Sequence, residues 1–182
     1  RHLDGVEVNG LVRYFDTNTY YRQPVVRGPI RWRGPALVDE WRFAASVAPK
    51  GVKAVITGPY TLASLAKTDG RPRREVVREF AAAVAQEVRA LREAGATRIQ
   101  VDEPAITRAH KDVGLLKEGI ETVAAEKGAS WLCLFTFFGD AAGILRDLAS
   151  LPIDNLGLDL VQGDRTWKEL KEAGSGIPLT LG

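Results

Sequence analysis

The sequence predicts an α/β fold in which strands and helices alternate and the strands run parallel. Strand-like and helix-like segments alternate six times along the 182 residues, and the loops between them are short. This rhythm is typical of β/α units that build a parallel sheet. No linker rich in proline, glycine or serine divides the chain, so we expect one domain over residues 1–182. Six such units form either an open doubly wound sheet or most of an eight-unit barrel, and a complete barrel takes about 250 residues.

The two ends of the sequence suggest that this domain is truncated. The chain does not begin with Met and contains none, and it stops at residues 179–182, which resemble a strand entering a loop. We therefore expect residues to be missing at both ends.

The first 24 residues are expected to be irregular structure lying over the rest of the domain. Residues 3–10 have the chemistry of a short hairpin or a loop, because Asp4-Gly5 and Asn9-Gly10 are pairs that favour turns. The first strand is expected to start at Pro24 and to run into a turn at Gly28-Pro29. Aromatic residues are interleaved with Asp, Asn and Arg over residues 14–24. That segment makes either a stacking surface for a ligand or an ordinary amphipathic loop packed on a barrel mouth.

Apolar periodicity places the remaining elements in order. The clearest helix covers residues 73–94, where an apolar stripe lies opposite Arg and Glu residues and Gly95 ends the pattern. Residues 130–138 are apolar on both faces, which is typical of a buried strand. The other strands are expected at 53–57, 97–103, 155–161 and 177–181, and the other helices at 38–48, 60–66, 113–125, 141–150 and 165–173, the last with Asp164 as its N-cap.

The strand at residues 97–103 ends in two adjacent carboxylates. Valine and isoleucine alternate with polar residues along it, and Pro104, which has no backbone N–H, ends it. Successive side chains point to opposite faces of a strand, so only one of Asp102 and Glu103 can face a central cavity. The alternative is that one of these carboxylates caps a loop or pairs with a neighbouring arginine.

Polar or backbone-shaping residues follow several strands. Gly58-Pro59, Asp102, Asp140 and Asp159 lie at or near the ends of four successive strands. Parallel strands bring their carboxyl ends to one rim, which is where such folds bind ligands. An aspartate at this rim can bind a substrate ammonium group through a charge-assisted hydrogen bond.

Composition argues against membrane and nucleic-acid partners. The 25 Lys and Arg nearly balance the 23 Asp and Glu, and 45% of residues are hydrophobic. No apolar run approaches the roughly 20 residues of a membrane span. No nucleic-acid motif is present, since the arginines at 71, 73 and 74 are better explained as the solvated first turn of a helix.

The single cysteine, Cys133, excludes an internal disulfide and suits a reducing cytoplasm, which is the localisation we expect.

The residues give little support for a metal site. Zinc takes three or four Cys, His or carboxylate ligands. Cys133 lies in mid-strand among apolar residues and is interpreted as a small core residue. His2 and His110 are far apart in sequence, and His110 is expected to be exposed on a helix or loop. Neither a glycine-rich phosphate fingerprint nor a Walker loop is found.

The chain resembles the cobalamin-independent methionine synthase family. The resemblance spans almost the whole chain and is carried by four segments that occur in the family's order: Tyr14-Phe15-Asp16-Thr17-Asn18, Gly58-Pro59-Tyr60-Thr61, Asp102-Glu103-Pro104-Ala105 and Leu158-Asp159-Leu160. It implies a (β/α)8 TIM barrel, incomplete in this chain, and a methyltransferase that transfers a methyl group to homocysteine or a related thiol. A barrel resembling uroporphyrinogen decarboxylase is a weaker alternative.

The resemblance also implies roles for particular residues. Asp102 matches an aspartate that holds the amino group of homocysteine, and Asp159 matches a glutamate that ligates zinc. The substrate-binding set inferred from this likeness is Asp102, Glu103, Asp159 and Asn18. The implied ligand is a homocysteine-like amino acid.

Several positions depart from the pattern of the catalytic relatives. Their His-x-Cys zinc pair falls on Phe135 and Phe137, which cannot ligate a metal, so zinc is implied by the family but no metal ligand is assigned here. Their folate-contacting residues fall on Leu65 and Arg108. These departures favour an alternative, in which the chain is like the zinc-free amino-terminal barrel and binds a ligand or a partner barrel without catalysis. Beside the small-molecule substrate, the expected partners are a methyl-donor protein or a partner barrel.

Overall fold

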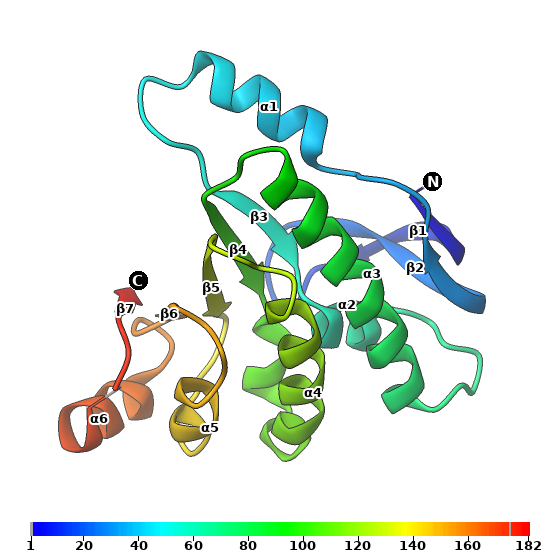
Figure 1. The fold of residues 1–182 in the computed structure, drawn as a ribbon. Coiled ribbons are helices and arrows are strands. Elements are labelled where there is room, and N and C mark those ends of the chain that lie inside the picture. The colour runs from blue at the N-terminus through cyan, green and yellow to red at the C-terminus, as the bar shows by residue number, and fades with distance from the viewer. Residues whose placement is uncertain (1, 175) are drawn as a thin grey trace.

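The computed structural model describes residues 2–174 and 176–182 (Figure 1). The strands of this part of the chain form two separate sheets. The larger sheet has five parallel strands in the order β3-β4-β5-β6-β7. Each strand lies beside its predecessor in sequence, so the described sheet lacks the order reversal of a doubly wound fold. The strands are β3 Ala54–Thr57, β4 Arg98–Asp102, β5 Trp131–Thr136, β6 Asn155–Leu158 and β7 Leu179–Leu181.

The second sheet is a long antiparallel hairpin, and it corrects the prediction for the start of the chain. Residues expected to be irregular form β1 (Leu3–Arg13), which pairs with β2 (Tyr20–Trp32). The expected first parallel strand is thus part of β2, and five parallel strands replace the six predicted β/α units. The expected turn at Gly28-Pro29 is wrong as well, because β2 continues through it.

The turn-forming pairs near the N-terminus mark irregularities within β1 instead of turns. The register with β2 shifts between Asp4 and Val6 and again between Val8 and Leu11. Gly5 has a φ of 73°, and a Cβ on it would overlap the carbonyl oxygen of Pro29. Bulges and tight turns both use residues that tolerate positive φ, so an Asp-Gly pair alone does not distinguish them.

The helices agree with the predicted order but differ in length. They are α1 Val38–Val47, α2 Pro59–Leu65, α3 Arg73–Glu93, α4 Val113–Ala124, α5 Leu145–Ala149 and α6 Asp164–Ala173, with short 3-10 helices η1 Pro104–Arg108 and η2 His110–Asp112. Helix α5 is half its predicted length because residues before it form a loop in which Asp140 accepts hydrogen bonds from the backbone of Ala142 and Arg165. Asp164 begins α6 instead of capping it.

The two faces of the parallel sheet have different surroundings. Ile99, Val101, Leu132 and Leu134 point to the face covered by helices and are at most 1% exposed. Helices α3 and α4 lie side by side over this face (Figure 1). The alternate residues, including Gln100 and its register partner Cys133, point to the opposite face, which these helices do not cover. Cys133 is buried, as predicted, but it belongs to this second face.

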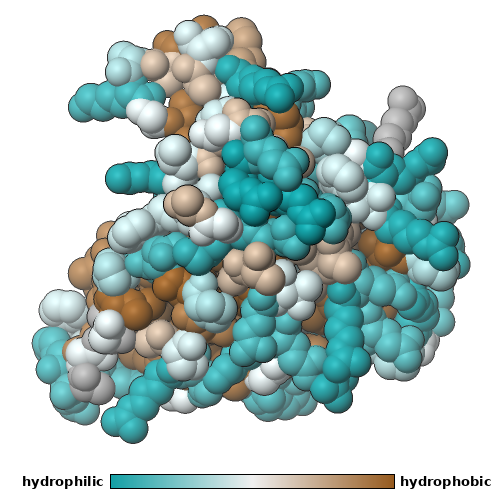
Figure 2. All heavy atoms as spheres, viewed as in Figure 1, coloured by the Kyte–Doolittle hydropathy of each residue, from teal (hydrophilic) through white to brown (hydrophobic). Residues whose placement is uncertain are grey.

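Hydrophobic residues also reach the surface at both edges of the sheet. Figure 2 shows them on α1 and over the β5–β7 end of the molecule. Phe43 of α1 is 71% exposed and Leu181 of the edge strand β7 is 51% exposed. Unpaired strand edges beside apolar side chains are surfaces that proteins usually cover. Within the described residues, no helix combines the length and apolar character needed to cross a membrane.

Carboxylates of α3 hold the hairpin against the helical layer. Glu87 is only 4% exposed, and its oxygens accept hydrogen bonds from Trp32 Nε1 at 2.9 Å and from the backbone N–H groups of Ala36 and Leu37. Glu79 accepts a further hydrogen bond from the backbone N–H of Ile30. Buried carboxylates need such donors to offset the loss of hydration.

We predict that Glu87→Gln destabilises the fold. An amide has one acceptor oxygen in place of two and turns its NH2 group toward N–H donors, so the free energy of unfolding should fall by about 2 kcal/mol. Urea denaturation measures this change. Glu93→Gln, on the same helix with a side chain 62% exposed, is the matched control and should shift the midpoint little. Equal effects of the two substitutions would contradict the role given to Glu87.

Candidate binding site at the rim of the sheet

One row of residues crosses the sheet at the carboxyl ends of the strands. Thr57, Asp102, Phe135 and Gly157 are successive Cα partners from β3 to β6. They lie on the face that α3 and α4 leave open. A Cβ on Gly157 would overlap the ring of Phe135, so the absence of a side chain at Gly157 makes room for this ring. The row therefore places a carboxylate beside an aromatic ring on the face of the sheet that α3 and α4 do not cover.

Asp102 is the predicted carboxylate in this row, and few groups of the protein contact its side chain. Its side chain is partly buried, and Oδ1 accepts a hydrogen bond from Gln100 Nε2 at 2.7 Å. This is the one hydrogen bond to the Asp102 carboxylate found among the described residues. Burial raises the pKa of Asp102, while the Gln100 amide and the Lys53 ammonium lower it. An ammonium group from a ligand would supply the donor that the second oxygen lacks.

Glu103 has a different environment, since its side chain is fully buried. Oε1 accepts a hydrogen bond from the backbone N–H of Tyr60 at 2.9 Å, and Oε2 accepts one from Thr61 N–H at 2.7 Å. The carboxylate thus caps the start of α2. A Cβ on Gly58 would overlap Glu103 Oε1, so this approach requires glycine. Glu103 is therefore a capping carboxylate. Because its side chain is 0% exposed, it is not accessible to a ligand at the rim.

Burial has a further effect on Glu103. It raises the pKa of the carboxyl group to about 7, against the opposing effect of the hydrogen bonds from Thr61 and Tyr60. Asp102 nearby adds to the rise because two neighbouring negative charges repel each other.

Asp159 lies directly after β6, which ends at Leu158 and not at residue 161 as predicted. Its Oδ1 accepts hydrogen bonds from Val161 N–H at 3.0 Å and Gln162 N–H at 2.9 Å, and Oδ2 accepts one from Phe138 N–H at 3.1 Å. The carboxylate therefore ties the loop after β6 to the loop after β5. Asp159 also lines a cavity of about 290 Å³ together with Phe135 and Phe137.

The hairpin connection packs against the loop after β5 through aromatic rings. Tyr14 and Phe15 contact Phe138, with ring centroids 6.1 and 6.0 Å apart. Phe15 and Phe138 both have positive φ, 52° and 62°, which is unusual for bulky residues and tends to occur at functional sites. Asn18 lies exposed in this connection. Of the segment interpreted as a loop over residues 14–24, only residues 14–19 are a connection that packs through aromatic rings, because residues 20–24 belong to β2.

Tyr14 brings the aromatic cluster close to the carboxylates. Burial, followed by the charges of Asp102 and Glu103, raises the pKa of Tyr14 to about 12, so its hydroxyl stays protonated and neutral at physiological pH. Arg108 pairs with Asp16 at 2.6 Å and lies 5.1 Å from the Phe15 ring, which fixes the outer side of the cluster.

Two residues near the rim, His110 and Lys53, lie in surroundings that the sequence did not predict. His110 was expected to be exposed, but it is partly buried and its Nε2 lies 2.8 Å from the carbonyl oxygen of Asp140. Lys53 was not singled out, yet its Nζ lies 4.6 Å from the centroid of the Phe135 ring. The only sequence signal for Lys53 is a lone positive charge at the start of an apolar strand.

The residues at the rim do not fit a zinc ion. Phe135 and Phe137 carry no ligating atom, and the oxygens of Asp159 accept hydrogen bonds from three backbone N–H groups. Among the residues with a described placement, no group of three or more His, Cys, Asp and Glu side chains could hold a metal.

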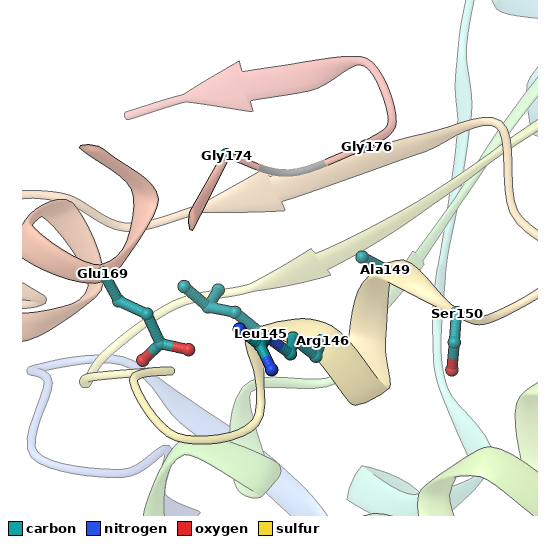
Figure 3. Close-up of a pocket in the computed structure, with 7 residues that line it drawn as sticks. All are labelled: Leu145, Arg146, Ala149, Ser150, Glu169, Gly174 and Gly176. Atoms are coloured by element: carbon teal, nitrogen blue, oxygen red, sulfur yellow. The ribbon is translucent and has the colours of Figure 1, made fainter. Parts of the chain in front are cut away.

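A second cavity, of about 360 Å³, lies away from the rim in the helical layer. Figure 3 shows Glu169 of α6 on one side of it and Leu145, Arg146 and Ala149 of α5 on the other. None of the predicted site residues lines this cavity. Asp102 and Asp159 are the predicted site residues that lie at or next to the carboxyl ends of the parallel strands.

Comparison with known proteins gives a consistent picture. The family described as "Cobalamin-independent synthase, N-terminal domain" matches residues 4–181. A methionine synthase of Saccharolobus solfataricus is 36% identical over 96% of this chain. A 5-methyltetrahydropteroyltriglutamate–homocysteine methyltransferase of Herpetosiphon aurantiacus is 33% identical, also over 96% of this chain. The chain spans 55% and 23% of the lengths of these two relatives.

The fold also resembles a solved structure. A B12-independent methionine synthase from Shewanella sp. W3-18-1 superposes with a TM-score of 0.82 at 22% identity, over all of this chain and 59% of that one. The α/β fold with its parallel sheet is thus shared with a methionine synthase.

The buried carboxyl group of Glu103 predicts a pH dependence of stability. Its pKa is about 7 in the folded chain and 4.5 in the reference state, so the folded chain holds the extra proton between these values. Stability therefore falls as the pH rises through this window, and the contribution is constant above about 7. Urea denaturation of wild type and Glu103→Gln at several pH values isolates it, since the variant has no titrating group there. A difference in unfolding free energy that does not change with pH would contradict it.

Proposed function

Since the chain belongs to the family of the N-terminal domain of cobalamin-independent synthases, we propose that it takes part in methyl transfer to homocysteine or a related thiol. Its part in the reaction is to bind the amino acid at the rim of the parallel sheet. The open carboxylate of Asp102 carries this proposal, because it has one hydrogen-bond partner among the described residues and faces the side that α3 and α4 do not cover.

In the proposed barrel, the carboxylate of Asp102 would lie where such folds bind ligands. The strand order β3 to β7 continues in one direction, as in part of a (β/α)8 barrel, and the open face would then become the barrel interior. In that arrangement Asp102 lies at the carboxyl-terminal mouth, where barrels place their ligand sites. The exposed apolar residues at the β3 and β7 edges suit additional strands and helices, or a partner barrel, on either side.

Methyl transfer to a thiol sets the chemical requirements of the site. The sulfur must lose its proton, the thiolate then forms a bond to the methyl carbon, and the bond between that carbon and the donor breaks with its electron pair going to the donor. The rim residues include no set that fits a zinc ion. We therefore assign binding and orientation of the amino acid to this chain, and the activation of the thiol and the supply of the methyl group to a partner barrel or methyl-donor protein.

A second candidate is a domain that supports a partner barrel without binding the amino acid. It is favoured by the roles of Glu103 and Asp159, whose oxygens accept hydrogen bonds from backbone N–H groups. Under this alternative Asp102 is a polar residue of the barrel interior and homocysteine has no site on the chain.

We predict that Asp102→Asn weakens the binding of homocysteine by about 10- to 150-fold, the loss expected for one charge-assisted hydrogen bond. Isothermal titration calorimetry on the full chain measures the dissociation constant. Asp39→Asn removes a carboxylate that is 97% exposed on α1 and is the control for net charge. Absence of homocysteine binding to the folded wild-type chain would rule out the proposal and favour the supporting domain.

A further inference from the structure

We propose that Lys53 is the second charged residue of the amino-acid site, with its ammonium group binding the ligand's α-carboxylate while Asp102 binds the α-ammonium. The site would then select zwitterionic α-amino acids over simple amines and simple acids. This inference rests on the function proposed above and adds to it the residue that binds the ligand's carboxylate.

The position of the Lys53 side chain is the first observation behind this inference. Lys53 directly precedes β3, yet its Nζ lies 4.6 Å from the centroid of the Phe135 ring on β5. Strand β4 lies between β3 and β5, and adjacent strands are about 4.8 Å apart. The side chain therefore reaches across β4 on the open face and delivers its ammonium group to the row that contains Asp102 and Phe135.

The relation between the two charges is the second observation. The charge of Lys53 lowers the pKa of Asp102, so the ammonium group lies close enough for its field to reach the carboxylate. No ion pair within 4.0 Å joins these two side chains in the described part of the chain. Two opposite charges that face the same space without contact leave room for a ligand to bridge them.

An α-amino acid matches this arrangement because its ammonium and carboxylate groups are attached to one carbon. Each group would meet the opposite charge, and the pair of contacts adds no net charge to the partly buried site. The Phe135 ring provides a fixed support for the ammonium of Lys53 through a cation–π contact, and Gly157 leaves the space in which that ring lies.

An alternative role for Lys53 is binding of a simple anion. Lys50, Lys53 and Arg98 line a cleft of about 460 Å³ at the amino-terminal ends of β3 and β4. A ligand held by these cations alone would not need Asp102. The two roles therefore differ in whether the ammonium group of the ligand contributes to binding.

Calorimetric titration of the full chain with three related thiols tests the inference. Homocysteine carries both charged groups, 3-aminopropane-1-thiol lacks the carboxylate, and 4-mercaptobutanoate lacks the ammonium. The variants are Lys53→Gln, Asp102→Asn, and Lys50→Gln as a matched control from the same segment. Lys53→Arg, which keeps the charge but changes the shape of the cation, should bind homocysteine more tightly than Lys53→Gln does. Circular dichroism and thermal unfolding of each variant verify that it folds.

The expected pattern is specific to the charge that each variant removes. Lys53→Gln should weaken homocysteine by about 10-fold or more and leave 3-aminopropane-1-thiol unchanged. Asp102→Asn should weaken homocysteine and leave 4-mercaptobutanoate unchanged. Lys50→Gln should change none of the three.

Other results overturn the inference in distinguishable ways. If Lys53→Gln binds homocysteine like wild type while Asp102→Asn does not, Lys53 is not part of the site but the proposed function stands. If 4-mercaptobutanoate binds wild type as tightly as homocysteine does, the ligand is a simple anion. If none of the thiols binds the folded wild-type chain, both the inference and the proposed function fail.

Discussion

Glu103 connects three elements at the rim through its buried carboxylate and its backbone. Its oxygens accept hydrogen bonds from the first turn of α2, its backbone N–H donates to the carbonyl oxygen of Phe135 at the end of β5, and it directly follows β4. Gly58 N–H donates to the carbonyl oxygen of Asp102 in the same junction. A fully buried carboxyl group needs the N–H donors of Tyr60 and Thr61 to offset the loss of hydration. This junction therefore joins the end of β4, where Asp102 lies, to α2 and β5.

Sequence patterns were most informative where a local rule decides the structure. The helix at α3 follows from a single apolar stripe, and a strand interrupted by Pro104 places Asp102 at a carboxyl end. The hairpin was missed because β1 combines exposed residues with Asp-Gly and Asn-Gly pairs, and its partner strand begins with residues assigned to a loop. Local turn chemistry gives no information about which distant segment completes a ribbon.

The individual roles of the rim residues were less accessible from sequence for a related reason. The donors to Glu103 come from residues more than 40 positions earlier, so nothing in Asp102-Glu103-Pro104 separates a capping carboxylate from a binding one. Lys53 likewise acquires its surroundings from a strand two positions away in the sheet. The alternation of side chains along β4 correctly indicated that the two carboxylates differ, but the three-dimensional contacts decide which one meets the open face.

The contact between Phe135 of β5 and Gly157 of β6 means that a substitution at one position affects the other. The ring occupies the volume that any side chain at position 157 would need. A smaller residue at 135 would free that volume, and a larger residue at 157 would displace the ring together with the cation–π support of Lys53. Substitution at either position is therefore constrained by the other, because a side chain at position 157 fits only if the ring at position 135 moves or is replaced by a smaller residue.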